Sequence, residues 1–210
     1  MGESCRPDRH QAERFLAALD PHARTFSFRT FSDTPYTRLP GADPLEAELL
    51  GSLGDCWTAL VKLNRAGAAV CVRVNADGPA HSSESVGRFR ALFADVDRPL
   101  AAAESSDLAP HLIVRSSPGH LHLYWLVENL PVGAFRAAQT EIARRCRADR
   151  RACALNQALR LPGFWHRKDP RRPCRVRLVR LVPEPAYRLQ DLILADLVDP
   201  THPEFALQTG

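Results

Sequence analysis

The sequence predicts an α+β protein that forms a single domain, and three observations support this prediction. The chain has 210 residues, which is enough for one sizeable hydrophobic core. Segments with the two-residue period of strands are mixed irregularly with segments of helical period, a pattern typical of sheets covered by helices. The sequence contains no Gly-rich loop of the P-loop or Rossmann type, which argues against those nucleotide-binding folds.

The first part of the chain contains two expected helices and two expected strands. Residues 8–20 place Phe15, Leu16 and Leu19 on one side of a helix. Phenylalanine then alternates with polar residues, which is the period of a half-buried strand. Gly67 is placed to cap the C-terminus of the second helix. The expected elements are helices at 8–20 and about 45–65, strands at 25–31 and 69–74, and an exit turn at 75–78.

The rest of the chain is richer in strands. Pro131 stands where a helix begins, because proline fits the first turn, and Pro162 stops a shorter helix. Basic and apolar residues alternate along 175–181, which predicts a strand with one solvated basic face. The expected elements are strands at 90–96, 111–115, 121–127 and 175–181, and helices at 132–147, 151–159 and 187–197.

The chain shows no repeat, low-complexity tract or long linker, so we expect one domain over residues 1–210. It divides into an N-terminal helix (1–24), a core (25–182) and a C-terminal helix and tail (183–210). The N-terminus is polar and charged, and no run approaches the roughly 18 apolar residues that a membrane-spanning helix needs. We therefore expect a cytoplasmic protein without membrane association, whose six cysteines are reduced thiols.

Positive charge is concentrated in one part of the sequence. Between Arg144 and Arg180 there are thirteen Arg or Lys residues and two Asp residues, although the whole chain carries a net charge of only +4. A general preference for arginine explains the choice of Arg over Lys but does not explain this clustering. The segregation predicts a face that binds a polyanion.

Asp95 and Asp97 form the first chemically informative motif. They end an apolar strand, and the two-residue period projects both carboxylates from the same face. Two like charges so close repel each other unless a cation lies between them. The pair is therefore a candidate magnesium site, because hard cations prefer carboxylate oxygens.

Two further segments carry polar side chains suited to phosphate. Ser116-Ser117-Pro118-Gly119 forms a turn whose hydroxyls and amides can face a phosphate, and His120 and His122 share one face of the strand that follows. Further along the chain, Arg160 and Lys168 flank a Pro-Gly turn, where their cations can reach a triphosphate. Asp149 stands between expected helices among arginines.

Taken together and in this order, these segments resemble the archaeo-eukaryotic primase superfamily, specifically its plasmid RepB-like primase and prim-pol branch. That family has an acidic pair that ends a strand, a Ser-x-x-Gly-x-His strand, a third acidic residue, and an Arg-x-Pro-Gly segment with a downstream lysine. The matching residues here are Asp95 and Asp97, Ser117-Pro-Gly-His-Leu-His122, Asp149, Arg160-Leu-Pro-Gly163 and Lys168. The glycine of the serine segment comes one position early, and the looser resemblance runs from about Phe26 to Leu181.

The resemblance implies a primase core, in which an RRM-like mixed sheet joins an N-terminal α/β lobe with the site in the cleft between them. It implies a nucleotidyltransferase, a DNA primase or primase-polymerase that makes or extends primers on single-stranded DNA from nucleoside triphosphates. Two Mg²⁺ or Mn²⁺ ions would be held by Asp95, Asp97 and Asp149. The triphosphate contacts would come from Ser117, His122, Arg160 and Lys168, with His122 also counted as catalytic.

The resemblance also assigns the basic stretch to the DNA template. The candidate phosphate contacts are Arg171, Arg172, Arg175 and Arg177. Because the sequence has no helicase motif and little chain after the core, we expect a separate helicase or replication protein as a partner. The sequence departs from the family pattern at Ala154 and Gln157, where an acidic residue and an arginine are frequent, and has an additional histidine, His120.

Two other functions fit some of the same residues. His120 and His122 with the Asp95/Asp97 pair make a possible mixed metal site for a metal-dependent phosphoesterase. The second alternative is a replication-associated module that binds single-stranded DNA and has lost catalysis. Metal preference separates the first alternative from a primase, and a metal-dependent nucleotide incorporation assay separates the second.

Overall fold

A computed structural model describes residues 6–34, 43–75, 89–97, 108–148, 154 and 156–201. Within these residues the chain has two four-stranded sheets, with strand orders β2-β1-β3-β7 and β10-β5-β6-β4, and the two-stranded pair β8-β9. The elements are α1 (Arg9–Leu19), β1 (Phe26–Ser32), β2 (Ala47–Gly51), α2 (Leu53–Ala66), β3 (Ala68–Arg73), β4 (Ala91–Val96), β5 (Leu112–Ser117), β6 (His120–Leu126), α3 (Val132–Cys146), β7 (Ala158–Arg160), β8 (Trp165–His166), β9 (Cys174–Arg175), β10 (Arg177–Leu181) and α4 (Leu189–Leu194).

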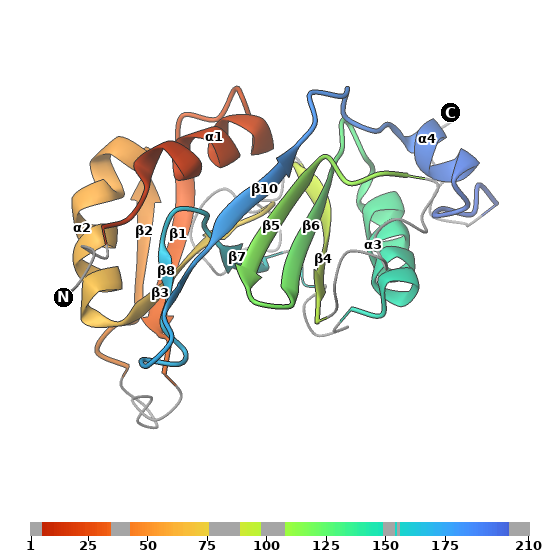
Figure 1. Cartoon of the computed structure of the whole chain (residues 1–210). Coiled ribbons are helices and arrows are strands. Elements are labelled where there is room, and N and C mark those ends of the chain that lie inside the picture. The colour runs from red at the N-terminus through yellow and green to blue at the C-terminus, as the bar shows by residue number, and fades with distance from the viewer. Residues whose placement is uncertain are drawn as a thin grey trace.

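The two four-stranded sheets form the centres of two lobes, which Figure 1 shows side by side. The first lobe contains α1 and α2, and the second contains α3 and α4. The chain returns to both sheets near its C-terminal end, because β7 pairs with β3 and β10 pairs with β5. The paired strands of these sheets are antiparallel, and a parallel bridge joins Val127 to Tyr187. The predicted α+β class is confirmed.

Local sequence signals explain where the first two helices begin and end. Asp8 caps α1 by accepting from the backbone N–H of Gln11, and Ser52 forms a reciprocal capping box with Asp55 at the start of α2. Gly67 ends α2 with φ of 108°, a left-handed conformation that favours glycine. The sequence had indicated this cap correctly.

Four predicted elements differ from the structure. The helix expected over 45–65 begins only at Leu53, because residues 47–51 pair with β1 as a strand. The prediction of a helix over 151–159 is wrong at its C-terminal end, because residues 158–159 belong to β7. Most of the other residues of that predicted helix lie outside the part of the chain that the structure describes. Buried Val176 separates β9 from β10, so the strand expected over 175–181 is divided. The last helix is shorter than 187–197, with six residues.

Each face of the second sheet packs against a different neighbour. Alternate residues of a strand face opposite sides, and Tyr124 of β6 contacts Phe15 of α1, with ring centroids 5.2 Å apart. Trp125, the next residue, lies with Ile142 and Cys146 of α3 around a small cavity. The face that carries Tyr124, and with it His122, is therefore turned toward the first lobe.

A buried ion pair joins the two lobes close to the start of β4. Arg90 Nε lies 2.9 Å from Asp20 Oδ2, and both side chains are almost fully buried. Asn75, at the end of β3, accepts from the backbone N–H groups of Arg90 and Ala91 and donates to the Ala91 carbonyl. These buried polar contacts attach the start of β4 to the end of α1 and to the residue Asn75 that follows β3.

No helix in the described part of the chain is long and apolar enough to cross a membrane. The division into N-terminal helix, core and C-terminal tail stays a prediction.

Candidate active site between the two lobes

The acidic pair lies at the end of β4, as predicted. Asp95 pairs in register with His122 of the neighbouring strand β6, and His122 Nε2 lies 3.7 Å from Asp95 Oδ1. Asp97, two residues further on, has its Oδ1 atom 2.9 Å from His120 Nδ1. The side chain of Asp95 is 37% exposed and that of Asp97 is 82% exposed. Each carboxylate thus has its own histidine, and both remain open to a ligand on one side.

Gln139 of α3 holds the strand that carries Asp95. Its side-chain amide donates to the Phe93 carbonyl at 2.7 Å and accepts from the Phe93 N–H at 3.0 Å. Both side chains are buried. Among the described residues no strand pairs with this edge of β4, and the two bonds satisfy the backbone groups of Phe93 and hold the strand two residues before Asp95.

His122 is buried and neutral. Burial, followed by the positive charge of the nearby Arg160, lowers its pKa to about 3. Its Nδ1 atom is buried and has no hydrogen-bond partner among the described residues. A neutral imidazole carries one donor and one acceptor nitrogen, so His122 can donate a single hydrogen bond to a ligand beside Asp95.

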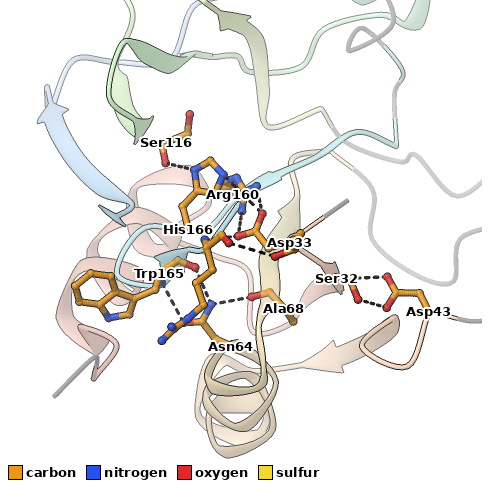
Figure 2. A network of polar contacts seen from close by, with 11 residues as sticks. Ser32, Asp33, Asp43, Asn64, Ala68, Ser116, Arg160, Trp165 and His166 are labelled. Carbon is orange, nitrogen blue, oxygen red and sulfur yellow. Dashed lines mark hydrogen bonds and ion pairs between the residues drawn. The ribbon is translucent and has the colours of Figure 1, made fainter. Parts of the chain in front are cut away.

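Arg160 reaches this site from the first lobe. It lies on β7, and its guanidinium donates to both carboxylate oxygens of Asp33, at 3.2 and 2.6 Å (Figure 2). Asp33 follows β1, is almost completely buried, and also accepts from the Arg167 backbone N–H at 2.6 Å. A two-point pair of this kind fixes the plane of the guanidinium, while an arginine with five N–H groups keeps donors for a further partner.

His166 connects the two lobes through a single hydrogen bond. Its Nδ1 atom lies 3.0 Å from the carbonyl oxygen of Ser116 on β5, and its Nε2 atom lies 3.6 Å from Asp33 Oδ1 (Figure 2). Burial, and next the charge of Arg160, lowers the pKa of His166. The neutral ring therefore carries its proton on Nδ1 and donates it to Ser116, which ties β8 to the second sheet.

Tyr124 adds a buried hydroxyl to the same face as His122. Its pKa lies well above the ordinary value, chiefly because of burial and then because of the negative charge of Asp95. The hydroxyl has no hydrogen-bond partner among the described residues. It is thus a protonated donor near Asp95. The sequence alone could have placed Tyr124 on the same face as His122, because it follows His122 by two residues and alternate residues of a strand share a face.

The serine turn and the remaining predicted residues take different positions. Ser117 is the ladder partner of His120, and Gly119 makes the turn with φ of 81°. Lys168 is exposed just after β8. Asp149 lies outside the described residues. Ala154 and Gln157 precede β7, where Gln157 accepts from the Val74 N–H and gives its own N–H to Ala154.

The four candidate template residues divide into two groups. Arg171 and Arg172 are exposed between β8 and β9. Arg175 and Arg177 lie on either side of buried Val176 and line a common pocket, as expected for alternate positions. Arg175 also lies over the Trp165 ring, 5.2 Å from its centroid, and donates to the Arg6 carbonyl.

Asp95 and Asp97 offer the oxygen ligands that Mg²⁺ and Mn²⁺ prefer. Within the described ranges there is no group of three His, Cys, Asp or Glu side chains arranged to hold a metal ion. Magnesium is commonly bound by one or two carboxylates together with substrate phosphates. The two carboxylates therefore fit a metal that arrives with a nucleotide better than a closed zinc site, and the described residues do not form the mixed His/Asp site considered above.

The family model of the RepB DNA-primase N-terminal domain matches residues 82–199, and the chain belongs to this family. The match spans both the Asp95/Asp97 pair and Arg160. No curated protein matches the chain.

Three solved structures share the fold. The AEP domain of the cyanophage S-2L primase-polymerase has a TM-score of 0.72 and 17% identity, over 90% of this chain and 98% of that chain. The crystal structure of primase RepB′ has a TM-score of 0.60 and 21% identity, over 84% of this chain and 57% of that chain. The catalytic domain of RepB′ in complex with initiator DNA has a TM-score of 0.60 and 20% identity, over 84% of this chain and 86% of that chain. The fold is therefore that of primase-polymerase domains.

Proposed function

We propose that this chain is the catalytic domain of a DNA primase or primase-polymerase, which joins nucleotides on single-stranded DNA. One observation supports this most strongly. Asp95 and His122 lie in register on the face turned toward the other lobe, beside Arg160. Carboxylates, a neutral hydrogen-bond donor and a fixed cation are the groups that phosphoryl transfer requires.

Asp95 and Asp97 would hold two Mg²⁺ or Mn²⁺ ions together with Asp149. When bound, these ions would supply activation of the attacking hydroxyl and neutralisation of the triphosphate charge. Asp97 accepts from His120, which orients its carboxylate. His120 thus acts on the site through Asp97 rather than through the nucleotide.

His122, Arg160, Ser117 and Lys168 would contact the triphosphate. His122 donates one hydrogen bond without adding charge, because its pKa is lowered to about 3. Arg160 supplies positive charge from a guanidinium whose orientation Asp33 fixes. Such preorganised donors stabilise the charge that develops on phosphoryl oxygens. Lys168 is exposed and would complete the contacts from outside the cleft.

The basic face would bind the DNA strand. The neighbour RepB′ is described in complex with initiator DNA, and Arg171, Arg172, Arg175 and Arg177 are the candidate phosphate contacts here. Contacts to phosphates depend steeply on salt and carry no sequence information. A cytoplasmic location and a separate helicase or replication partner remain predictions.

Metal-dependent nucleotide incorporation on a primed single-stranded template tests the proposal directly. We expect incorporation with Mg²⁺ or Mn²⁺ and none with the Asp95→Asn variant, which keeps the shape of the side chain. A wild-type protein that binds DNA without adding nucleotides would instead be the non-catalytic module. Release of phosphate from a phosphoester substrate, without incorporation, would identify the phosphoesterase.

A further inference from the structure

A pocket of about 530 Å³ lies beside the serine turn, and neither Asp95 nor Asp97 lines it. Its lining includes Arg115, Ser117, Trp165, Arg175 and Arg177. The volume is in the range of pockets that bury small organic ligands. Three of these residues are cationic, and none of the lining residues that the structure describes is acidic. Arg175 Nη1 lies 4.0 Å from Asp8 Oδ2, so Arg115 and Arg177 are the cations that suit the pocket to an anion.

Two of the arginines lie directly opposite each other on neighbouring strands. Arg115 of β5 and Arg177 of β10 are direct ladder partners, and both are exposed. Like charges directly opposite each other destabilise a sheet. Neither guanidinium has an ion pair or hydrogen bond with any residue that the structure describes. A phosphate between the two guanidinium groups would remove this repulsion.

Trp165 gives the pocket an aromatic wall, and hydrogen bonds hold its backbone in place. Asn64 accepts from the Trp165 N–H at 3.0 Å and donates to its carbonyl at 2.8 Å. Figure 2 shows that the indole points away from Asp33, Arg160 and His166. Adjacent residues of a strand face opposite sides, so β8 turns His166 toward the catalytic cleft and Trp165 toward the pocket.

We propose that this pocket binds a nucleotide, with its phosphate between Arg115 and Arg177 and its base against Trp165. Phosphate recognition by arginine and stacking of a base on an indole are the two requirements for such a ligand. Arg175 belongs to the same wall, since its guanidinium lies over the indole and is anchored to the Arg6 carbonyl.

The pocket lies next to the proposed catalytic site but on another side of the β5–β6 turn. Arg115 pairs with Leu121, whereas Val114 pairs with His122, so Arg115 faces away from the catalytic histidine. Ser117 connects the two sites, because it lines the pocket and pairs with His120. The inference rests on the proposed function, and the bound nucleotide is either part of the DNA strand or a free triphosphate.

Binding without divalent metal tests the pocket separately from catalysis. A labelled oligodeoxythymidylate is titrated at several salt concentrations against wild type, R115Q/R177Q, W165L and W165F. The matched control is R180Q, which removes an exposed arginine from the same strand outside this pocket. Circular dichroism and thermal unfolding show that each variant is folded.

We expect W165L to weaken binding roughly five- to one-hundred-fold, because stacking contributes about that factor per base, and W165F to retain most affinity. R115Q/R177Q should flatten the slope of log affinity against log salt by about 0.7 per phosphate contact. Competition by dTTP identifies the source of the nucleotide. Displacement in wild type that is lost in R115Q/R177Q indicates a free triphosphate, and no displacement indicates a nucleotide of the strand.

The pocket inference is wrong if R115Q/R177Q and W165L both bind the oligonucleotide and dTTP as R180Q does. Nucleotide incorporation by the same preparations keeps the two proposals apart. If the pocket variants behave like R180Q and the wild type adds nucleotides, the nucleotide-binding pocket is contradicted and the primase proposal stands. If the pocket variants lose binding and the wild type adds no nucleotides, the pocket is supported and the primase proposal is contradicted.

Discussion

Arg160 and Asp33 form a two-point ion pair that couples β7 to the end of β1, within the same sheet. The two nitrogen-to-oxygen distances are 3.2 and 2.6 Å, and the Asp33 side chain is only 1% exposed. Because Asp33 also accepts from the Arg167 N–H, one carboxylate orients both the cation and the turn that leads to Lys168.

Removal of Asp33 should therefore reduce stability strongly. Loss of one partner of a buried pair leaves an uncompensated charge, which costs about 3–5 kcal/mol, so Asp33→Ala should lower the free energy of unfolding by that amount in urea. The matched comparison is Glu46→Ala, which breaks the exposed pair with Arg29 and should cost less than about 1 kcal/mol. Equal losses in the two variants would show that Asp33 does not hold a buried charge.

Replacing Asp95 or Asp97 with Ala should abolish nucleotide addition and leave DNA affinity equal or slightly higher. Each substitution removes a proposed metal ligand and a negative charge from the cleft. Primer extension and single-strand binding, measured on the same preparation, check the two parts. Extension near the wild-type rate by either variant would contradict the two-metal proposal.

The two histidines should differ in kinetic effect. His122 faces Asp95 from a buried position and His120 is exposed against Asp97. We expect His122→Ala to raise the nucleotide KM and lower kcat by roughly one to three orders of magnitude, as for a lost transition-state donor. His120→Ala should be several-fold milder in steady-state extension kinetics. The reverse order would assign the nucleotide contact to His120 instead of His122.

The lowered pKa of His122 predicts how stability depends on pH. The unfolded chain takes up a proton near the ordinary histidine pKa of 6.5, whereas folded His122 does so only at about 3. Its contribution to stability is therefore complete above pH 6.5 and is lost as the pH falls toward 3. Between pH 7 and 5, wild type should lose about 1–2 kcal/mol more than His122→Gln in urea unfolding. Parallel pH curves for the two proteins would contradict the buried neutral state.

Arg171 and Arg172 provide a test of the basic face outside the pocket. Both are exposed between β8 and β9, so Arg171→Gln/Arg172→Gln removes charge without disturbing the core. If each contacts one phosphate, the salt slope of single-strand binding should flatten by about 0.7 per contact, to a similar extent for different sequences. An unchanged slope would place the DNA elsewhere on the protein.

Much of the fold and part of the site were accessible from sequence because they depend on local periodicity. Alternation along the predicted strands indicated that Asp95 and Asp97 share one face and that His120 and His122 share one face, and Gly67 identified a helix end. The sequence predicts a helix through Ala158 and Leu159, but both residues belong to the three-residue strand β7, which forms only by pairing with β3. Tertiary pairing of this kind leaves no periodic signal in so short a segment.

The supporting residues were not predicted because their partners are distant in sequence. Asp33 and Arg160 are separated by 127 positions, and nothing around Asp33 distinguishes it from an ordinary residue at a strand end. Gln139 lies within a helix whose pattern predicts only packing. These residues interact only through the folded arrangement, which the sequence motif does not describe.

The contact between Gln139 and Phe93 has a consequence for how this protein behaves toward other copies of itself. β4 is the outer strand of its sheet among the described residues, and an outer strand offers unpaired backbone groups to which a second chain can add. The amide of Gln139 already occupies one donor and one acceptor of β4. A Gln139→Leu variant would leave both groups without a partner, and the edge next to Asp95 would become a starting point for aggregation.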